Sequence, residues 1–308
     1  MQTKSKEQLR VYRLCGLLIL MACCFRSFAV LREPMKEGTG EIFQRIPYIE
    51  KEKQPSTAPP TVCPTVPVDS SLVDIDNRCG AVFGEQELFQ MPLSFRITEE
   101  PCILIVHSHG SEAYREKEGY RSSDPEENVV RVGREVAELL NAAGISTLHD
   151  TTLHDETRGY DSAYQESAKA IADYMEEYPN IQMVIDIHRD AVEDAAGRQK
   201  AMTTLIEGQP VAKLLLVMGT DLSGQTHPNW QRNLSFAMKL QSVLRQEHKE
   251  LLRQTSLRAS RYNQHLSPFS ILLEVGSAGN SGEEALRAAR YFAEALSDLL
   301  FGLDASEP

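Results

Sequence analysis

The sequence predicts an α/β fold with a central sheet of mostly parallel or mixed strands, flanked by helices. From about residue 100 onward, short apolar segments rich in Val, Ile and Leu alternate with longer segments whose apolar residues recur every three or four positions. The short segments are typical of buried strands, and the longer ones of amphipathic helices. Because strands and helices alternate along the chain, the sheet is expected to be mainly parallel.

The expected strands are apolar runs at residues 102–107, 145–149, 181–188 and 269–276. Two further segments, "TTLIE" and "AKLLLVMGT", predict a hairpin closed by "GQP". Cys102, at the start of the first run, is expected to be a buried free thiol.

Four helices are expected, at residues 127–143, 163–178, 229–250 and 282–300. Gly144 is placed to end the first helix as its C′ residue, and the second stops before Pro179. Ser281 and Glu284 form a capping box at the start of the last helix.

Residues 1–33 combine basic residues with the apolar run "LCGLLILMACCF", the pattern of a secretion signal. The uninterrupted apolar core is about 12 residues, short of the ~20 that a bilayer span needs. Residues 14–31 nevertheless suit an uncleaved signal-anchor if Arg26 snorkels. A lipoprotein modified at Cys23 and a cleaved signal are the alternatives. All three place the rest of the chain outside the cytoplasm.

Residues 34–90 form the expected extracytoplasmic spacer, and residues 91–308 the expected catalytic domain. The spacer prediction rests on a stretch rich in Pro, Thr, Ser and charge. Outside the cell, Cys63 and Cys79 are able to close a loop. The net charge of −12 argues against nucleic acid as a partner.

Imidazoles and carboxylates stand at the ends of three apolar strands. The first strand runs into His107 and His109, the strand "MVIDI" into His188, and "SILLEVG" carries Glu274 inside an apolar run. Polar groups at the carboxyl ends of parallel strands converge on one sheet edge, where α/β folds place their chemistry. A buried Glu274 is costly unless its charge is compensated. These positions together predict a functional site at this edge of the sheet.

Two histidines and a carboxylate around an open position are the geometry of catalytic zinc, with water as the fourth ligand. A carboxylate that does not bind the metal then serves as general base. His107 and His109 are two residues apart, so either both approach the metal or one supports the other. A serine triad at Ser108 is disfavoured, because no nucleophile turn is evident.

The order and spacing of several blocks resemble the stage II sporulation protein P family over roughly residues 100–300. The blocks include "ILIVHSHGSEAY", "NVVRVGREVAELLNAAGI", "YDSAYQES", "VIDIHRDAV" and "YNQHLSPFSILLEVGSAGNSGEEALRAA". The resemblance implies a membrane-anchored, extracytoplasmic peptidoglycan hydrolase of the sporulation septum, active in engulfment. It also implies a fold similar to zinc N-acetylmuramoyl-L-alanine amidases, with Zn²⁺ as cofactor. The implied reaction is cleavage of the muramic acid–L-alanine amide, with peptide cross-links as further targets, alongside stage II sporulation proteins D and M.

The same resemblance implies site roles. His188 matches a zinc histidine and Glu274 the catalytic glutamate of the amidases. An ungapped comparison selects His109 over His107 as the other histidine, although both belong to the HxH motif. Glu112 is preferred as third ligand. Residues with further or competing roles are Arg189, expected in catalysis, Tyr262, Asn263 and Gln264, expected at the substrate, and Glu126 and Glu127, the alternatives to Glu112.

Two rival functions fit the same residues. One is a zinc-dependent deacetylase acting on the N-acetyl groups of the glycan, on the same scaffold. The other is a non-catalytic protein that binds the glycan strands of the cell wall and whose metal site is vestigial. Products released from the wall distinguish all three functions.

Overall fold

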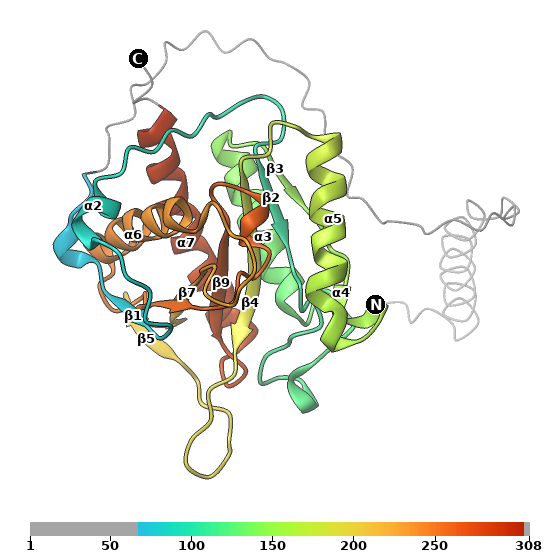
Figure 1. Ribbon diagram of the computed structural model, residues 1–308. Coiled ribbons are helices and arrows are strands. Elements are labelled where there is room, and N and C mark those ends of the chain that lie inside the picture. Colours follow the sequence, from blue (N-terminus) through green and yellow to red (C-terminus); the bar gives the residue numbers. More distant parts are fainter. Residues whose placement is uncertain (1–66, 305–308) are drawn as a thin grey trace, which may run out of the picture. The chain divides into compact units, whose positions relative to one another are not determined.

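The computed structural model describes residues 67–304, and within that range a central seven-stranded sheet organises the fold (Figure 1). Its strands run in the order β1-β8-β7-β9-β4-β2-β3. Their bounds are β1 Ile75–Asn77, β2 Ile103–Val106, β3 Thr147–His149, β4 Met183–Asp190, β7 Leu214–Gly219, β8 Thr255–Arg258 and β9 Ile271–Ser277. Neighbouring strands are parallel except β7 and β9, which are antiparallel. The mixed, mostly parallel sheet confirms the predicted fold class.

Helices cover both faces of the sheet, but unequally (Figure 1). One face packs against α3 (Val129–Ala143), α6 (Trp230–Glu247) and α7 (Gly282–Asp304), which enclose the main hydrophobic core. On the other face α5 (Ala163–Glu177) packs on β2 and β4 through a smaller cluster that includes Ile171. The shorter helices are α2 Glu85–Phe89, α4 His154–Thr157 and the 3₁₀ turns η1 Ser70–Leu72, η2 Glu118–Tyr120, η3 Tyr160–Ser162 and η4 Gln264–Leu266.

Alternation along the strands decides which residues face each side. In β4, Ile185 and Ile187 point into the main core, whereas Val184 belongs to the cluster under α5. Asp186 and His188 are in phase with Val184, so they leave the sheet on the same side as α5. Leu215 and Val217 of β7 lie on that side too, in a small separate cluster that Tyr262 contacts.

The local signals read from the sequence recur in the structure. Gly144 ends α3 in the left-handed conformation, with φ of 93°. The backbone N–H of Glu284 donates to Ser281 Oγ at 3.1 Å, and the N–H of Ser281 donates to a Glu284 carboxylate oxygen at 3.3 Å. The capping box at the start of α7 is therefore confirmed. Cys102 is fully buried as a free thiol.

The predicted hairpin is partly wrong. Its strands are β5 (Thr203–Ile206) and β6 (Gln209–Ala212), and its turn is Glu207-Gly208, both with positive φ. The following run "LLLVMG" is β7, which enters the central sheet between β8 and β9. Its continuous hydrophobicity suits a strand buried on both faces better than a hairpin arm.

The spacer does not extend to residue 90. Residues 75–77 form β1, which pairs with β8 at the sheet edge, and Leu88 and Phe89 of α2 pack into the main core. The proposed signal-anchor at 1–33 and Cys63 lie outside the described residues. Between residues 67 and 304, no helix is both long and apolar enough to cross a membrane.

Candidate active site

The ends of β2, β4 and β9 bring three chemistry-bearing segments together. These strands run parallel, so residues that follow β2 lie beside the end of β4. His109 and Glu112, from the loop after β2, meet His188 of β4, and ligand atoms of the three lie within 4.8 Å of one another. All three side chains are buried. Two imidazoles and one carboxylate at this spacing are a donor set that fits a divalent metal ion such as zinc.

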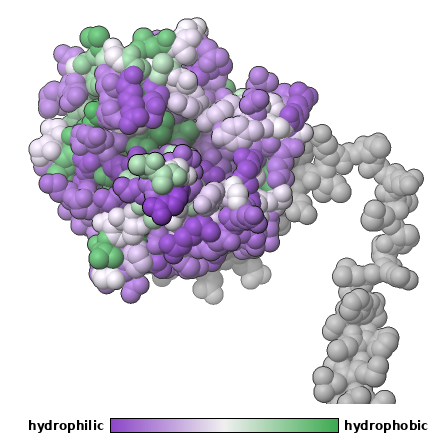
Figure 2. Space-filling model, turned by 90° about the horizontal axis from the view of Figure 1, so that it is seen from below, coloured by the Kyte–Doolittle hydropathy of each residue, from purple (hydrophilic) through white to green (hydrophobic). Residues whose placement is uncertain are grey.

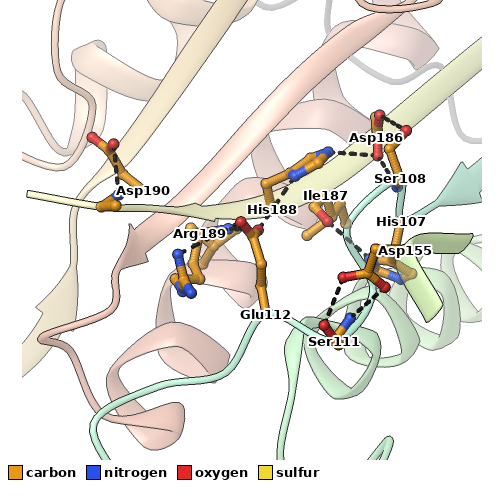
Figure 3. A network of polar contacts seen from close by, with 12 residues as sticks. His107, Ser108, Ser111, Glu112, Asp155, Asp186, Ile187, His188, Arg189 and Asp190 are labelled. Atoms are coloured by element: carbon orange, nitrogen blue, oxygen red, sulfur yellow. Dashed lines mark hydrogen bonds and ion pairs between the residues drawn. The ribbon is translucent and has the colours of Figure 1, made fainter. Parts of the chain in front are cut away.

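His188 lies between two carboxylates (Figure 3). Its Nδ1 is 3.3 Å from Glu112 Oε2, and its Nε2 is 2.8 Å from Asp186 Oδ1. Burial alone would lower the pKa of His188, but the two carboxylates raise it well above its ordinary value. A histidine with a carboxylate behind it is a common arrangement for a metal ligand, because the carboxylate orients the ring.

Asp186 is itself held in place by Ser108. The Ser108 backbone N–H donates to Asp186 Oδ1 at 2.8 Å, and its hydroxyl donates to Oδ2 at 2.6 Å. Burial alone would raise the pKa of Asp186, but His188 and the Ser108 hydrogen bonds lower it to about 2. Asp186 is therefore ionised, and Ser108 orients a carboxylate instead of acting as a nucleophile.

Arg189 fixes Glu112 and its loop, and contacts none of the other candidate ligands. Its backbone N–H donates to Glu112 Oε2 at 3.1 Å, and its Nη1 lies 3.5 Å from Glu112 Oε1. The rest of its guanidinium donates to the carbonyls of Ala113 and Tyr120, at 3.0 and 2.9 Å. These contacts describe a positioning residue for Glu112.

Aromatic side chains that the sequence analysis missed enclose His109. The Tyr160 ring stacks on the His109 ring at 4.1 Å with 8° between planes, and Tyr164 meets it edge-on at 5.3 Å. Tyr164 also stacks on His188 at 6.3 Å. Tyr160 lies in η3 and Tyr164 in the first turn of α5, and their four-residue spacing was the available signal.

Asp155, from α4, holds the turn that carries His109 and Glu112. Its fully buried carboxylate accepts hydrogen bonds from the Ser111 hydroxyl at 2.6 Å and from Arg121 at 2.7 Å. Asp155 immediately follows His154, and no local sequence pattern connects it with residue 111. The contact links two segments that are distant along the chain.

His107 is separated from the cluster. It lies against α3, where its Nδ1–H donates to the Ile187 carbonyl at 2.9 Å and its Nε2 contacts His149 Nε2 at 2.8 Å. Burial lowers the pKa of His107 to about 4 and that of His149 well below its ordinary value, so both are neutral. Because a carbonyl can only accept, His149 must donate to His107. Strand β2 ends at Val106, so the alternation expected for residues 107 and 109 does not apply.

Glu274 stands beside the cluster without binding to it. It pairs in register with His188 on the neighbouring strand, and both side chains leave the same face of the sheet. Its Oε2 is buried and has no hydrogen-bond partner among the described residues. Burial raises the pKa of Glu274 to about 8, and the nearby Glu112 carboxylate adds to the increase. An unpartnered carboxyl with a raised pKa has the properties of a general base or acid.

A groove of about 790 Å³ begins at Glu274 and extends over the sheet face that α5 leaves uncovered. Leu215 and Val217 of β7 contribute to it, together with charged residues of β1, β8 and the loops around them. Seen from below, the surface is largely hydrophilic, with apolar area recessed among polar side chains (Figure 2).

The three residues predicted to line the substrate groove shape a loop over the sheet. Gln264 accepts from the Gly219 N–H and donates to the Val217 carbonyl, both at 2.8 Å. Asn263 donates to the Tyr164 carbonyl at 2.8 Å. Tyr262 and Asn263 both have positive φ, a conformation that costs energy in residues other than glycine. The Tyr262 ring lies 5.9 Å from that of Tyr164.

The alternative third ligands lie elsewhere. Glu126 is exposed and forms an ion pair with Arg134, and Glu127 is half-buried and forms one with Lys117 at 2.5 Å; both lie outside the His109–Glu112–His188 cluster. Of the carboxylates considered from the sequence, Glu112 is the one that the structure brings to the two histidines.

Comparison with known proteins gives the following. A family model described as Stage II sporulation protein P matches residues 50–297. The chain is 27% identical over 216 residues to the Stage II sporulation protein P of Bacillus subtilis (strain 168), covering 65% of this chain and 51% of that protein. The chain therefore spans about half the length of this relative.

Solved structures with a similar fold include two N-acetylmuramoyl-L-alanine amidases. AmiC2 of Nostoc punctiforme is 16% identical, with a TM-score of 0.42, covering 65% of this chain and 96% of that one. The catalytic domain of CwlV from Bacillus (Paenibacillus) polymyxa var. colistinus is 10% identical, with a TM-score of 0.39, covering 65% and 98%. Similarity at this level carries no argument about the chemistry of this chain.

Proposed function

The chain belongs to the stage II sporulation protein P family, and from this premise and the site geometry we propose that it is a zinc-dependent peptidoglycan hydrolase acting in sporulation. The proposed bond is the amide between N-acetylmuramic acid and L-alanine, with peptide cross-links as additional targets. The observation that carries the proposal is the buried His109–Glu112–His188 cluster, with the unpartnered Glu274 carboxyl beside it.

His109, Glu112 and His188 would hold the metal. The donor set is chemically suited to zinc, and three protein ligands leave a position for water or substrate. When bound, zinc supplies an acidic water and polarises the scissile carbonyl. Asp186 holds the His188 ring, and Arg189 holds Glu112. Both ligands are therefore preorganised by the residues that hold them.

Glu274 is assigned the proton transfers. Its Oε2 makes no hydrogen bond within residues 67–304, so it is free to accept a proton from the attacking water. The same carboxyl then returns the proton to the nitrogen of the leaving amine, which completes hydrolysis of the amide. A raised pKa suits both halves of this exchange, because the group gains and loses a proton near neutral pH.

The proposed setting follows from the family and the N-terminal sequence. The chain would be tethered to the cell membrane by residues 1–33, with its hydrolase domain outside the cytoplasm at the sporulation septum. Stage II sporulation proteins D and M are the proposed partners, and the peptidoglycan sacculus is the proposed substrate.

The deciding experiment incubates the full-length chain with purified sacculi, with and without a zinc chelator. Mass spectrometry of the released material should show stem peptides that begin at L-alanine, and chelation should abolish them. Release of acetate without stem peptides would indicate that the chain is a glycan deacetylase and not an amidase. Sacculi that bind the protein but stay intact would indicate a non-catalytic wall-binding protein.

A further inference from the structure

The groove that begins at Glu274 has a charged lining without aromatic side chains. Among the described residues that line it are six basic and six acidic side chains, and none is Phe, Tyr or Trp. Its floor includes Leu215 and Val217, each 7% exposed. Uncharged sugar rings are bound chiefly by stacking and neutral hydrogen bonds. A lining of mixed charge instead complements a chain that itself carries carboxylates and ammonium groups.

Most of these charges already have a partner within the groove. Their pairs are Arg78–Asp76, Arg253–Asp190, Lys213–Glu250 and Arg245–Asp74. Lys249 and Arg258 have no such partner among the described residues, and of these two only Arg258 carries a guanidinium. Its Nε donates to Ser256 Oγ at 2.8 Å, and it forms no ion pair with any carboxylate between residues 67 and 304. The two remaining guanidinium nitrogens are thus able to bind a carboxylate with two hydrogen bonds.

The sheet register sets the separation of Arg258 from Glu274. On β7, Leu215 pairs with Glu274 of β9, and Gly219 pairs with Arg258 of β8. The backbone positions of Glu274 and Arg258 are therefore separated by four residues along the strands and by two strand spacings across the sheet. Together these correspond to a distance of about 16 Å. An extended peptide covers ~3.3–3.6 Å per residue, so this distance corresponds to roughly four or five residues.

We propose that this groove binds the peptide side of the wall substrate, with the scissile amide at Glu274 and a carboxylate near the far end of the peptide on Arg258. The inference rests on the proposed function. It adds that the peptide half of the substrate occupies the groove, and that the position of Arg258 limits the length of this peptide. The glycan strand then leaves the site on the side away from β7 and β8.

Binding of free peptides tests this inference without turnover. The full-length chain, in chelator, is titrated calorimetrically with the tetrapeptide L-Ala-γ-D-Glu-L-Lys-D-Ala and with the same peptide amidated at its C-terminus. We expect the acid to bind about tenfold more tightly than the amide, as one carboxylate–arginine contact supplies. In Arg258→Ala this preference should disappear, whereas Arg290→Ala, which breaks an ion pair with Glu135 on the helical face, should retain it.

Equal affinity of the wild type for acid and amide would overturn the proposal, as would an Arg258→Ala variant that keeps the preference. Failure of both peptides to bind would overturn it too. Melting curves of Arg258→Ala show whether the variant is folded. Failure of the proposed function would look different. If the wild type prefers the acid, Arg258→Ala loses this preference and sacculi stay undigested, the peptide-binding groove is supported and the hydrolase activity is contradicted.

Discussion

His188 and Glu274 are register partners on the adjacent parallel strands β4 and β9, and their side chains leave the same face of the sheet. This relationship places a candidate metal ligand beside a buried carboxyl oxygen. His188 has Asp186 and Glu112 as partners, whereas Glu274 Oε2 has none among the described residues. In the proposed mechanism, His188 binds the metal and Glu274 transfers the protons.

Glu274→Gln should abolish hydrolysis without loss of zinc. The amide has nearly the same shape but cannot take up a proton, and general-base catalysis typically contributes 10²–10⁴-fold in rate. Stem-peptide release from sacculi and zinc content after dialysis are measured on the same sample. If the variant loses its zinc, Glu274 is a ligand and the division of roles is wrong.

His188→Ala should lose zinc, whereas His107→Ala should keep it. His188 supplies one of three donors, but His107 faces His149 on the other side of the sheet. His107→Ala should instead destabilise the fold, by about 2–3 kcal/mol, because it leaves His149 buried without its partner. Metal analysis and denaturant unfolding separate the two effects. Zinc loss in His107→Ala would mean that His107 approaches the metal.

Arg189→Ala should weaken zinc binding by about 10–100-fold, since residues that hold a metal ligand in place typically contribute that much. Saturating zinc should then restore most of the activity, because the guanidinium contacts Glu112 and two carbonyls but none of the other candidate ligands. Arg131→Ala, which breaks an exposed pair with Glu283, is the matched control. Activity that stays low at saturating zinc would return Arg189 to the catalytic role expected from the sequence.

Glu274→Gln should also change how stability depends on pH in the metal-free protein. Burial raises the pKa of Glu274 to about 8 in the folded chain, whereas the unfolded chain ionises this group near pH 4.5. Between those values the unfolded state releases a proton that the folded state keeps, so the wild type loses stability as pH rises. The variant should therefore melt at a higher temperature than wild type at about pH 8.5, and at nearly the same temperature at about pH 4. A constant difference at both pH values would contradict the raised pKa.

Gly133→Ala should destabilise the protein by about 1–3 kcal/mol, the usual cost of overpacking. A Cβ at this position of α3 would lie 2.5 Å from His107 Nε2 and 2.8 Å from His149 Nε2. Gly282→Ala is the control, because the nearest atom to its Cβ is 3.9 Å away, at the end of the Arg131 side chain. Equal melting temperatures for wild type and Gly133→Ala would show that the histidine pair adjusts freely.

The alternating architecture and the candidate groups at the strand ends could be predicted from local sequence. Hydrophobic periodicity located the strands and helices, since burial requires it whatever the partner element is. Turn and capping residues such as Gly144 and Ser281 act on backbone groups within a few residues of themselves, so they too can be recognised from local sequence. His188 and Glu274 were visible because each interrupts or ends an apolar run.

Which of these groups lie together depends on contacts between distant segments. The choice of His109 and Glu112 over His107, Glu126 and Glu127 depends on where the chain leaves β2 and turns, and Asp155 and Arg189 fix that turn from distant segments. The antiparallel entry of β7 beside β9, which opens the groove at Glu274, likewise depends on pairing between strands far apart along the chain. Contacts of this kind arise from packing in three dimensions, and local sequence patterns do not encode them individually.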